Sequence, residues 1–174
     1  MNGIQRSNET QDKKIDIFPW DDNFNTGLPL VDQQHRRLVE LLNLLASNVA
    51  FGTGAEVIDR IFDELADYAV YHFDSEEAIW REYLASDAAE AAHRALHSSF
   101  TEEVVRLKTS RDSVQLSAVA EETLGFLARW LASHILESDR YLAYVVLSRI
   151  EGKSLDSAKI HAKDHLQGTT RAQI

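Results

Sequence analysis

The sequence predicts an all-α protein, an antiparallel up-down-up-down four-helix bundle with an N-terminal loop arm and a C-terminal tail. Three observations support this prediction. Apolar residues make up 44% of the 174 residues and there are only two prolines and seven glycines, which is typical of a helical globule. Apolar residues recur at three- and four-residue spacing in four long stretches. The breaks between these stretches are short, which favours antiparallel neighbours.

The length fits a single domain. We expect residues 1–16, which are polar and of mixed charge, to form a flexible arm. Residues 17–151 hold the bundle, and residues 152–174 form a tail or linker. Eighteen basic against 28 acidic side chains give a net charge of -10, so nucleic acid is not an expected partner. The apolar runs are too short to cross a membrane and no signal peptide is evident, so we expect a cytoplasmic protein without membrane contact.

The first elements follow from local pattern. The segment from Trp20 to Pro29 combines Asp, Asn, Gly and Pro with aromatic residues and predicts an extended loop. Asp32 is the predicted cap of a first helix that runs to about Val49. Gly52 and its neighbours break that helix. A second, long helix is predicted from Val57 to Tyr83 by apolar residues at three- and four-residue spacing.

Two more helices complete the prediction. The third starts after Asp87 and ends near Ser110, and the fourth runs from about Val114 to Ile150. After Gly152 the helical periodicity is weaker, and the chain then becomes polar.

Five of the seven histidines fall on the stripes that should face the bundle axis, where apolar residues are the rule. His72 and Glu76 lie one turn apart on the second helix, and His93 and His97 do so on the third. Buried imidazoles and carboxylates destabilise a core unless something compensates them. A metal would compensate all of them together. Because the chain has no cysteine, its ligands would be imidazole and carboxylate, which suits iron, manganese or zinc.

Several segments together are similar to those of the bacterial hemerythrins, over about residues 18–146. They are Trp20, Asp32-Gln33-Gln34-His35, His72-Phe73-Asp74-Ser75-Glu76-Glu77, His93-Arg94-Ala95-Leu96-His97, Trp130-Leu131-Ala132-Ser133-His134-Ile135 and Asp139. All seven ligand positions of the family motif are filled. The resemblance implies reversible dioxygen binding at two non-haem iron ions joined by an oxo or hydroxo bridge.

The resemblance also implies a role for each residue. One iron would be bound by His93, His97 and His134, and the other by His35 and His72, with Glu76 and Asp139 bridging the two. The second iron would keep a position open for dioxygen. The matching apolar oxygen pocket would be formed by Leu38, Phe73, Trp130, Leu131 and Ile135.

One spacing in this set does not suit a regular helix. His134 and Asp139 are five residues apart, which separates their directions by about 140° on an ideal α-helix. Both can face one centre only if the helix is locally wider. The sequence therefore predicts a π-bulge near Glu137.

Several alternatives remain open at the level of sequence. The chain could be an oxygen or redox sensor that signals through its tail to an output domain, such as a diguanylate cyclase, or to a partner protein. It could instead be an oxygen carrier or store. A ferritin-like diiron oxidase or peroxidase is less expected because such enzymes use two Glu-x-x-His motifs, and here only Glu90 and His93 fit. We therefore expect the chain itself not to be an enzyme.

Two glutamates and one further pair of histidines suggest no further site. We expect Glu90 and Glu77 to lie on solvated faces. His161 and His165 lie beyond the bundle, and their spacing is interpreted as incidental.

Overall fold

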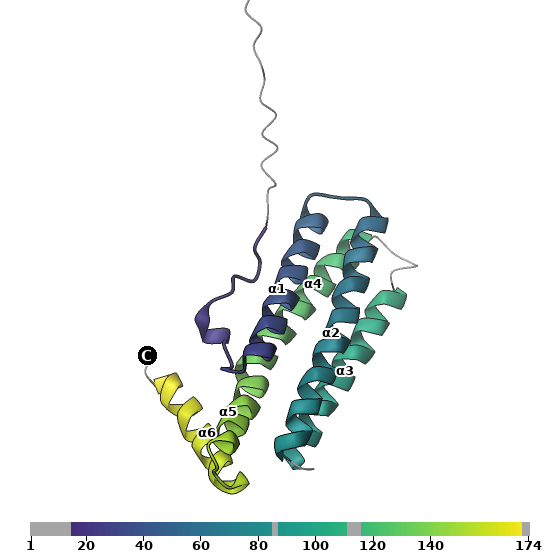
Figure 1. The fold of residues 1–174 in the computed structure, drawn as a ribbon. Coiled ribbons are helices and arrows are strands. Elements are labelled where there is room, and N and C mark those ends of the chain that lie inside the picture. Colours follow the sequence, from purple (N-terminus) through teal and green to yellow (C-terminus); the bar gives the residue numbers. More distant parts are fainter. Residues whose placement is uncertain (1–14, 85–86, 111–115, 172–174) are drawn as a thin grey trace, which may run out of the picture.

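The computed structural model describes residues 15–84, 87–110 and 116–171, which form helices and loops without a strand. The elements are η1 (Asp22–Phe24), α1 (Pro29–Ala50), α2 (Ala55–Leu84), α3 (Ala88–Ser110), α4 (Leu116–Ser133), η2 (His134–Asp139), α5 (Arg140–Ile150) and α6 (Leu155–Arg171). Four long rods lie side by side, and α4, η2 and α5 together make the fourth (Figure 1). The predicted four-helix bundle is confirmed.

Each rod packs against at least two others, and α2 also contacts α5 of the fourth rod. The helix α1 contacts α2 and α4, and α3 contacts the same two helices from the other side. Consecutive rods run in opposite directions, as their short connections require. Gly52, with a φ of +64°, makes the turn after α1 in the left-handed region that glycine favours. Among the residues described, no helix is both long and apolar enough to span a membrane.

The start of α1 corrects the predicted cap at Asp32. The helix begins at Pro29, whose fixed φ suits the first turn and whose missing N–H costs nothing there. Asp32 instead accepts hydrogen bonds from the N–H and hydroxyl of Thr26, at 2.6 and 2.8 Å. Its carboxylate therefore holds the incoming loop rather than the helix end.

The N-terminal segment lies along α1. Phe18 is held by the side chain of Asn43, which accepts from its N–H and donates to its carbonyl, both at 3.0 Å. Ile15 donates its N–H to Ser47 Oγ at 2.9 Å. Of the predicted flexible arm, residues 1–14 lie outside the described part of the chain, and the last two residues contact α1.

The predicted π-bulge is confirmed. Residues His134–Asp139 form a π-helix between α4 and α5, and the N–H of Arg140 donates to the carbonyl of Ile135, five residues earlier. This inserts one extra residue without bending the rod out of the bundle (Figure 1). As a result, the side chains at both ends of η2 face the bundle axis and are buried.

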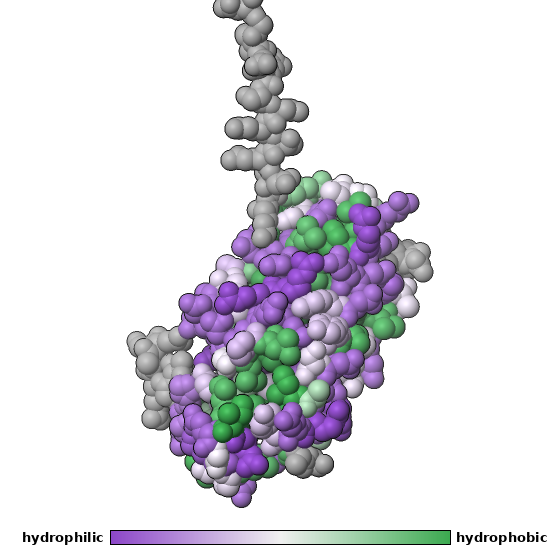
Figure 2. All heavy atoms as spheres, viewed as in Figure 1, coloured by the Kyte–Doolittle hydropathy of each residue, from purple (hydrophilic) through white to green (hydrophobic). Residues whose placement is uncertain are grey.

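The interior contains two separate apolar cores. One core contains Leu38, Leu42 and Phe62 with residues of α3 and α4. The other contains Trp80 and Leu142 with residues of α6. Outside, hydrophilic side chains cover most of the face in Figure 2, with apolar side chains in separate areas. The five predicted histidine ligands fall between the two cores.

The segment after Gly152 forms a helix, α6, which packs against α5 and leaves the bundle at an angle (Figure 1). Ala158 and Ala162 are fully buried in this contact, and their small size explains why the apolar pattern in the sequence is weak. Lys159 Nζ reaches both carboxylate oxygens of Asp87, at 3.0 and 2.9 Å. This ion pair joins α6 to the start of α3.

Asp87 provides a testable contribution to stability. Its Oδ1 accepts from the N–H of Ala89 at 2.9 Å, as a helix cap does. This hydrogen bond, and after it the one from Lys159, lowers the pKa of the Asp87 carboxyl below its usual range. A lowered carboxyl pKa stabilises the fold above the unfolded pKa, and the contribution is lost as the pH falls. We expect Asp87→Ala to reduce the free energy of unfolding by about 1 kcal/mol at pH 7.

The measurement is urea unfolding from pH 7 to pH 3. The difference between Asp87→Ala and the unchanged chain should shrink as the pH falls below about 4. Asp156→Ala, an exposed acidic residue in the first turn of α6, is the control. A pH-independent difference would contradict the role given to the Asp87 carboxylate.

Candidate metal centre

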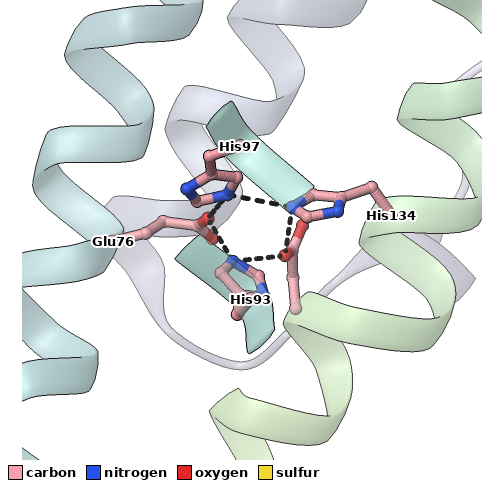
Figure 3. A group of neighbouring side chains, drawn as sticks. Glu76, His93, His97 and His134 are labelled. Carbon is pink, nitrogen blue, oxygen red and sulfur yellow. Dashed lines mark hydrogen bonds and ion pairs between the residues drawn. The ribbon is translucent and has the colours of Figure 1, made fainter. Parts of the chain in front are cut away.

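All seven predicted ligand side chains meet inside the bundle. They come from all four rods: His35 from α1, His72 and Glu76 from α2, His93 and His97 from α3, and His134 and Asp139 from η2. None is more than 5% exposed. Figure 3 shows four of them, Glu76, His93, His97 and His134, pointing toward one another. The centre is therefore closed to bulk solvent.

The seven side chains form two groups that overlap. In each group the potential ligand atoms lie within 4.8 Å of one another. One group contains three histidines, His93, His97 and His134, and the other contains two, His35 and His72. Glu76 and Asp139 belong to both groups. The arrangement could hold two cations side by side, with the two carboxylates shared between them.

The two shared carboxylates lie between the imidazoles of the two groups. Glu76 Oε2 is 3.4 Å from His93 Nε2, 3.5 Å from His97 Nε2 and 3.6 Å from His72 Nε2. On the other side, Asp139 Oδ1 is 3.1 Å from His134 Nε2, and Asp139 Oδ2 is 3.2 Å from His35 Nε2. The π-helix brings Asp139 to the same side as His134.

Outer hydrogen bonds orient three of the imidazoles. His97 Nδ1 donates to Glu77 Oε1 at 3.1 Å, and His72 Nδ1 lies 3.1 Å from Gln34 Oε1. Both oxygens are acceptors, so these Nδ1 atoms carry the hydrogen and the Nε2 lone pairs face inward. His93 Nδ1 is 2.7 Å from Ser138 Oγ.

These three outer partners were missed by the sequence interpretation, which placed Glu77 on a solvated face. Its side chain is 18% exposed and contacts His97. Each partner is the chain neighbour of a ligand: Gln34 precedes His35, Glu77 follows Glu76 and Ser138 precedes Asp139. Adjacency was the available signal, but it does not indicate which imidazole a neighbour will reach.

Several buried side-chain atoms at this centre have no hydrogen-bond partner among the described residues, which fits a site that binds a metal. Both ring nitrogens of His35, Oε1 of Glu76 and both carboxylate oxygens of Asp139 are buried without a hydrogen-bond partner. His97 Nε2 and His134 Nε2 are 3.0 Å apart, although an imidazole with hydrogen on Nδ1 has only a lone pair at Nε2. Converging lone pairs of this kind are typical of a cation site.

The pKa shifts of these side chains also suit a cation site. Burial raises the pKa of Glu76 to about 7, with a further contribution from Asp139. Burial also raises the pKa of Asp139 to about 7. The pKa values of the five imidazoles are lowered, in each case chiefly by burial. Neutral imidazoles are ready to bind a cation, and cations would displace the carboxyl protons.

A small apolar cavity adjoins the centre. It leaves about 20 Å³ for the centre of a water-sized molecule, which is room for about one such molecule. Four of the five residues predicted for the oxygen pocket line it: Leu38, Phe73, Trp130 and Leu131. The fifth, Ile135, is fully buried in the same apolar core but is not among the lining residues.

Two aromatic rings connect this cavity to the histidines. Phe73 stacks on His97, with ring centroids 3.9 Å apart and an interplanar angle of 12°. Trp130 stacks on His134 at 4.1 Å and 17°. Both rings therefore cover two of the predicted ligand imidazoles with an apolar surface on the cavity side.

Glu90 and the histidines of α6, which the sequence places outside the site, lie in different surroundings. The expectation that Glu90 lies on a solvated face is wrong, because it is 5% exposed and pairs with Arg94 at 3.4 Å. It belongs to neither ligand group among the described residues. His161 and His165 are exposed on α6, and His165 lies edge-on to Tyr144 at 4.3 Å.

Comparisons with known proteins agree with this geometry. The family model described as hemerythrin HHE cation binding domain matches residues 26–145. A bacteriohemerythrin of Pseudomonas paraeruginosa is 35% identical over 124 residues, covering 69% of this chain and 75% of the relative. A bacteriohemerythrin of Clostridium acetobutylicum is 33% identical over 129 residues, 71% of this chain and 97% of the relative. A hemerythrin-like protein of Naegleria gruberi is 30% identical over 122 residues, 70% and 87% of the two chains.

Proposed function

The chain belongs to the hemerythrin family, and from this premise we propose that it binds dioxygen reversibly at a centre of two non-haem iron ions. The observation that carries the proposal is the pair of overlapping ligand groups that share Glu76 and Asp139. Two cation sites with common carboxylates suit a pair of metal ions held close together. The adjoining apolar cavity suits a small apolar ligand.

The ligand assignment follows the two groups. His93, His97 and His134 would hold one iron, His35 and His72 the other, and Glu76 and Asp139 would bridge them. The group with two histidines supplies fewer protein ligands, so that iron is the one with room for dioxygen. When bound, the iron pair would supply the electrons that dioxygen takes up and returns.

The protein's own part is to keep the chemistry reversible. Phe73 and Trp130 cover His97 and His134 on the cavity side and keep water and proton donors away from the ligand. Glu77, Gln34 and Ser138 fix the direction of three imidazoles. Burial of all seven side chains strengthens their attraction for cations. A site with five imidazoles and two carboxylates favours binding over oxidase chemistry.

The proposal is tested by metal analysis together with an optical titration. Two irons per chain are expected, with a visible charge-transfer band that appears when the reduced protein is aerated and disappears under vacuum. A chain that binds no iron, or that changes irreversibly and releases product on aeration, would contradict reversible dioxygen binding.

A ligand substitution tests the assignment. We expect His93→Ala to lose iron from at least one position, because His93 Nε2 lies 3.4 Å from both shared carboxylates. Iron content is measured after dialysis against a weak chelator. Arg94→Ala, on the exposed face of the same turn, should keep both irons. Two irons in His93→Ala would count against the assignment.

We also propose that the chain acts as an oxygen or redox sensor rather than a carrier. The helix α6 packs on α5, which follows the ligand Asp139 directly. Lys159 ties α6 to Asp87 at the start of α3, which carries His93 and His97. A change at the centre therefore has two paths to α6. Hydrogen exchange of α6 should differ between the reduced, oxygenated and ferric forms, whereas a pure carrier would show no difference.

A further inference from the structure

A groove lies between α2 and α3 on the outside of the bundle. Its volume is about 370 Å³. Ala66 and Val70 line it from α2, and Val104 and Val105 line it from α3. Val70 and Val105 are 46% and 56% exposed, so the groove is open to solvent. Asp63, Asp67, Thr101 and Lys108 also line the groove, and Lys108 pairs with Asp63, so its apolar side chains form one part of the lining.

Only two side chains are shared between this groove and the cavity beside the metal centre. Ala69 and Phe100 line both hollows. They are 4% and 8% exposed. Because Ala69 contributes a single methyl group, the ring of Phe100 forms most of the shared wall. Phe100 therefore lies between the groove and the cavity.

The ring of Phe100 belongs to an aromatic cluster that continues to the ligands. It lies 4.1 Å from Trp130 and is edge-on to Phe73 at 5.6 Å. Those two rings stack on His134 and His97. A molecule that passes Phe100 thus enters the cavity beside the two rings that cover the metal centre.

We propose that dioxygen reaches the centre through the groove between α2 and α3, and that Phe100 controls its passage. Protein interiors are close-packed, so a ligand enters an enclosed cavity only when a side chain moves. Where the groove meets the cavity the lining is apolar, formed by Ala69 and Phe100, and such a lining admits dioxygen more readily than water. As far as the iron pair is concerned, this inference rests on the proposed function.

The test uses substitutions with opposite expected effects on stopped-flow oxygen kinetics. Phe100→Ala removes the wall, and we expect both the association and the dissociation rate to rise about tenfold. The equilibrium affinity should stay nearly constant because entry and exit use one route. Ala66→Phe fills the groove without touching the cavity, and both rates should fall. Leu45→Ala, the control, shortens a buried core side chain that lines neither hollow, and both rates should stay unchanged.

A second measurement does not depend on iron. The chain has three tryptophans, so with Trp20→Phe and Trp80→Phe only Trp130 fluoresces. Quenching of Trp130 by dissolved oxygen in the full-length chain should rise with Phe100→Ala and fall with Ala66→Phe. If this order holds while no variant binds dioxygen reversibly, the route stands and the proposed function fails. If neither substitution changes the oxygen rates or the quenching of Trp130, the proposed route is wrong.

Discussion

Replacing Glu76 with glutamine is expected to abolish the metal centre, with the loss of both ions rather than one. Glu76 is fully buried and belongs to both ligand groups. Its Oε2 lies within 3.6 Å of Nε2 of His72, His93 and His97. A carboxamide keeps the size of the side chain but removes the negative charge that two cations would share. The iron affinity should fall by more than about a hundredfold, above the usual effect of losing an outer partner.

The variant should still fold, because the pKa of the buried Glu76 carboxyl is raised to about 7 and glutamine resembles its neutral form. Iron content and the far-ultraviolet circular dichroism of the same sample are the measurements. Glu82→Gln, exposed near the end of the same helix, is the matched control and should retain two irons. Two irons bound by a folded Glu76→Gln chain would show that the carboxylate is not shared.

Replacing Phe73 with alanine is expected to have the second largest effect, on the lifetime of the oxygenated protein. Phe73 is 5% exposed, lines the apolar cavity and stacks on His97 at 3.9 Å. Its removal opens space for water beside a ligand imidazole. We expect conversion to the ferric form to accelerate about tenfold or more. The free energy of unfolding should also fall, by about 3–5 kcal/mol.

The lifetime is followed optically in air after reduction. Leu42→Ala is the control, since Leu42 lines the same cavity and its truncation carries a similar stability cost of about 2–5 kcal/mol. It leaves the ring over His97 in place, so the oxygenated form should survive nearly as long as in the unchanged chain. Equal acceleration by both substitutions would mean that core softening, and not exposure of His97, sets the lifetime.

The fold and the convergence of the seven proposed ligand side chains could be predicted because both depend on spacing along helices. Histidines on the inward stripes and the five-residue step from His134 to Asp139 are properties of the sequence alone. That step has one simple solution, a wider turn, and η2 provides it. Residues on a regular rod have directions that follow from their numbers.

Features that depend on contacts between rods could not be predicted in this way. Glu77 reaches His97 only because α2 and α3 lie close enough together. Glu90 is buried, although its position in the sequence suggests a solvated face. The docking of α6 rests on two alanines, which carry little apolar signal. The start of α1 was misplaced because a proline at the first turn has more influence there than an acidic residue three positions later.

The most direct test of the central claim is diffraction from crystals of the iron-loaded protein on both sides of the iron absorption edge. Two anomalous peaks are expected, and they should appear only above the edge. One should lie among His93, His97 and His134, and the other between His35 and His72, with Glu76 and Asp139 touching both. A single peak, or iron bound elsewhere while these seven side chains contact no metal, would contradict it.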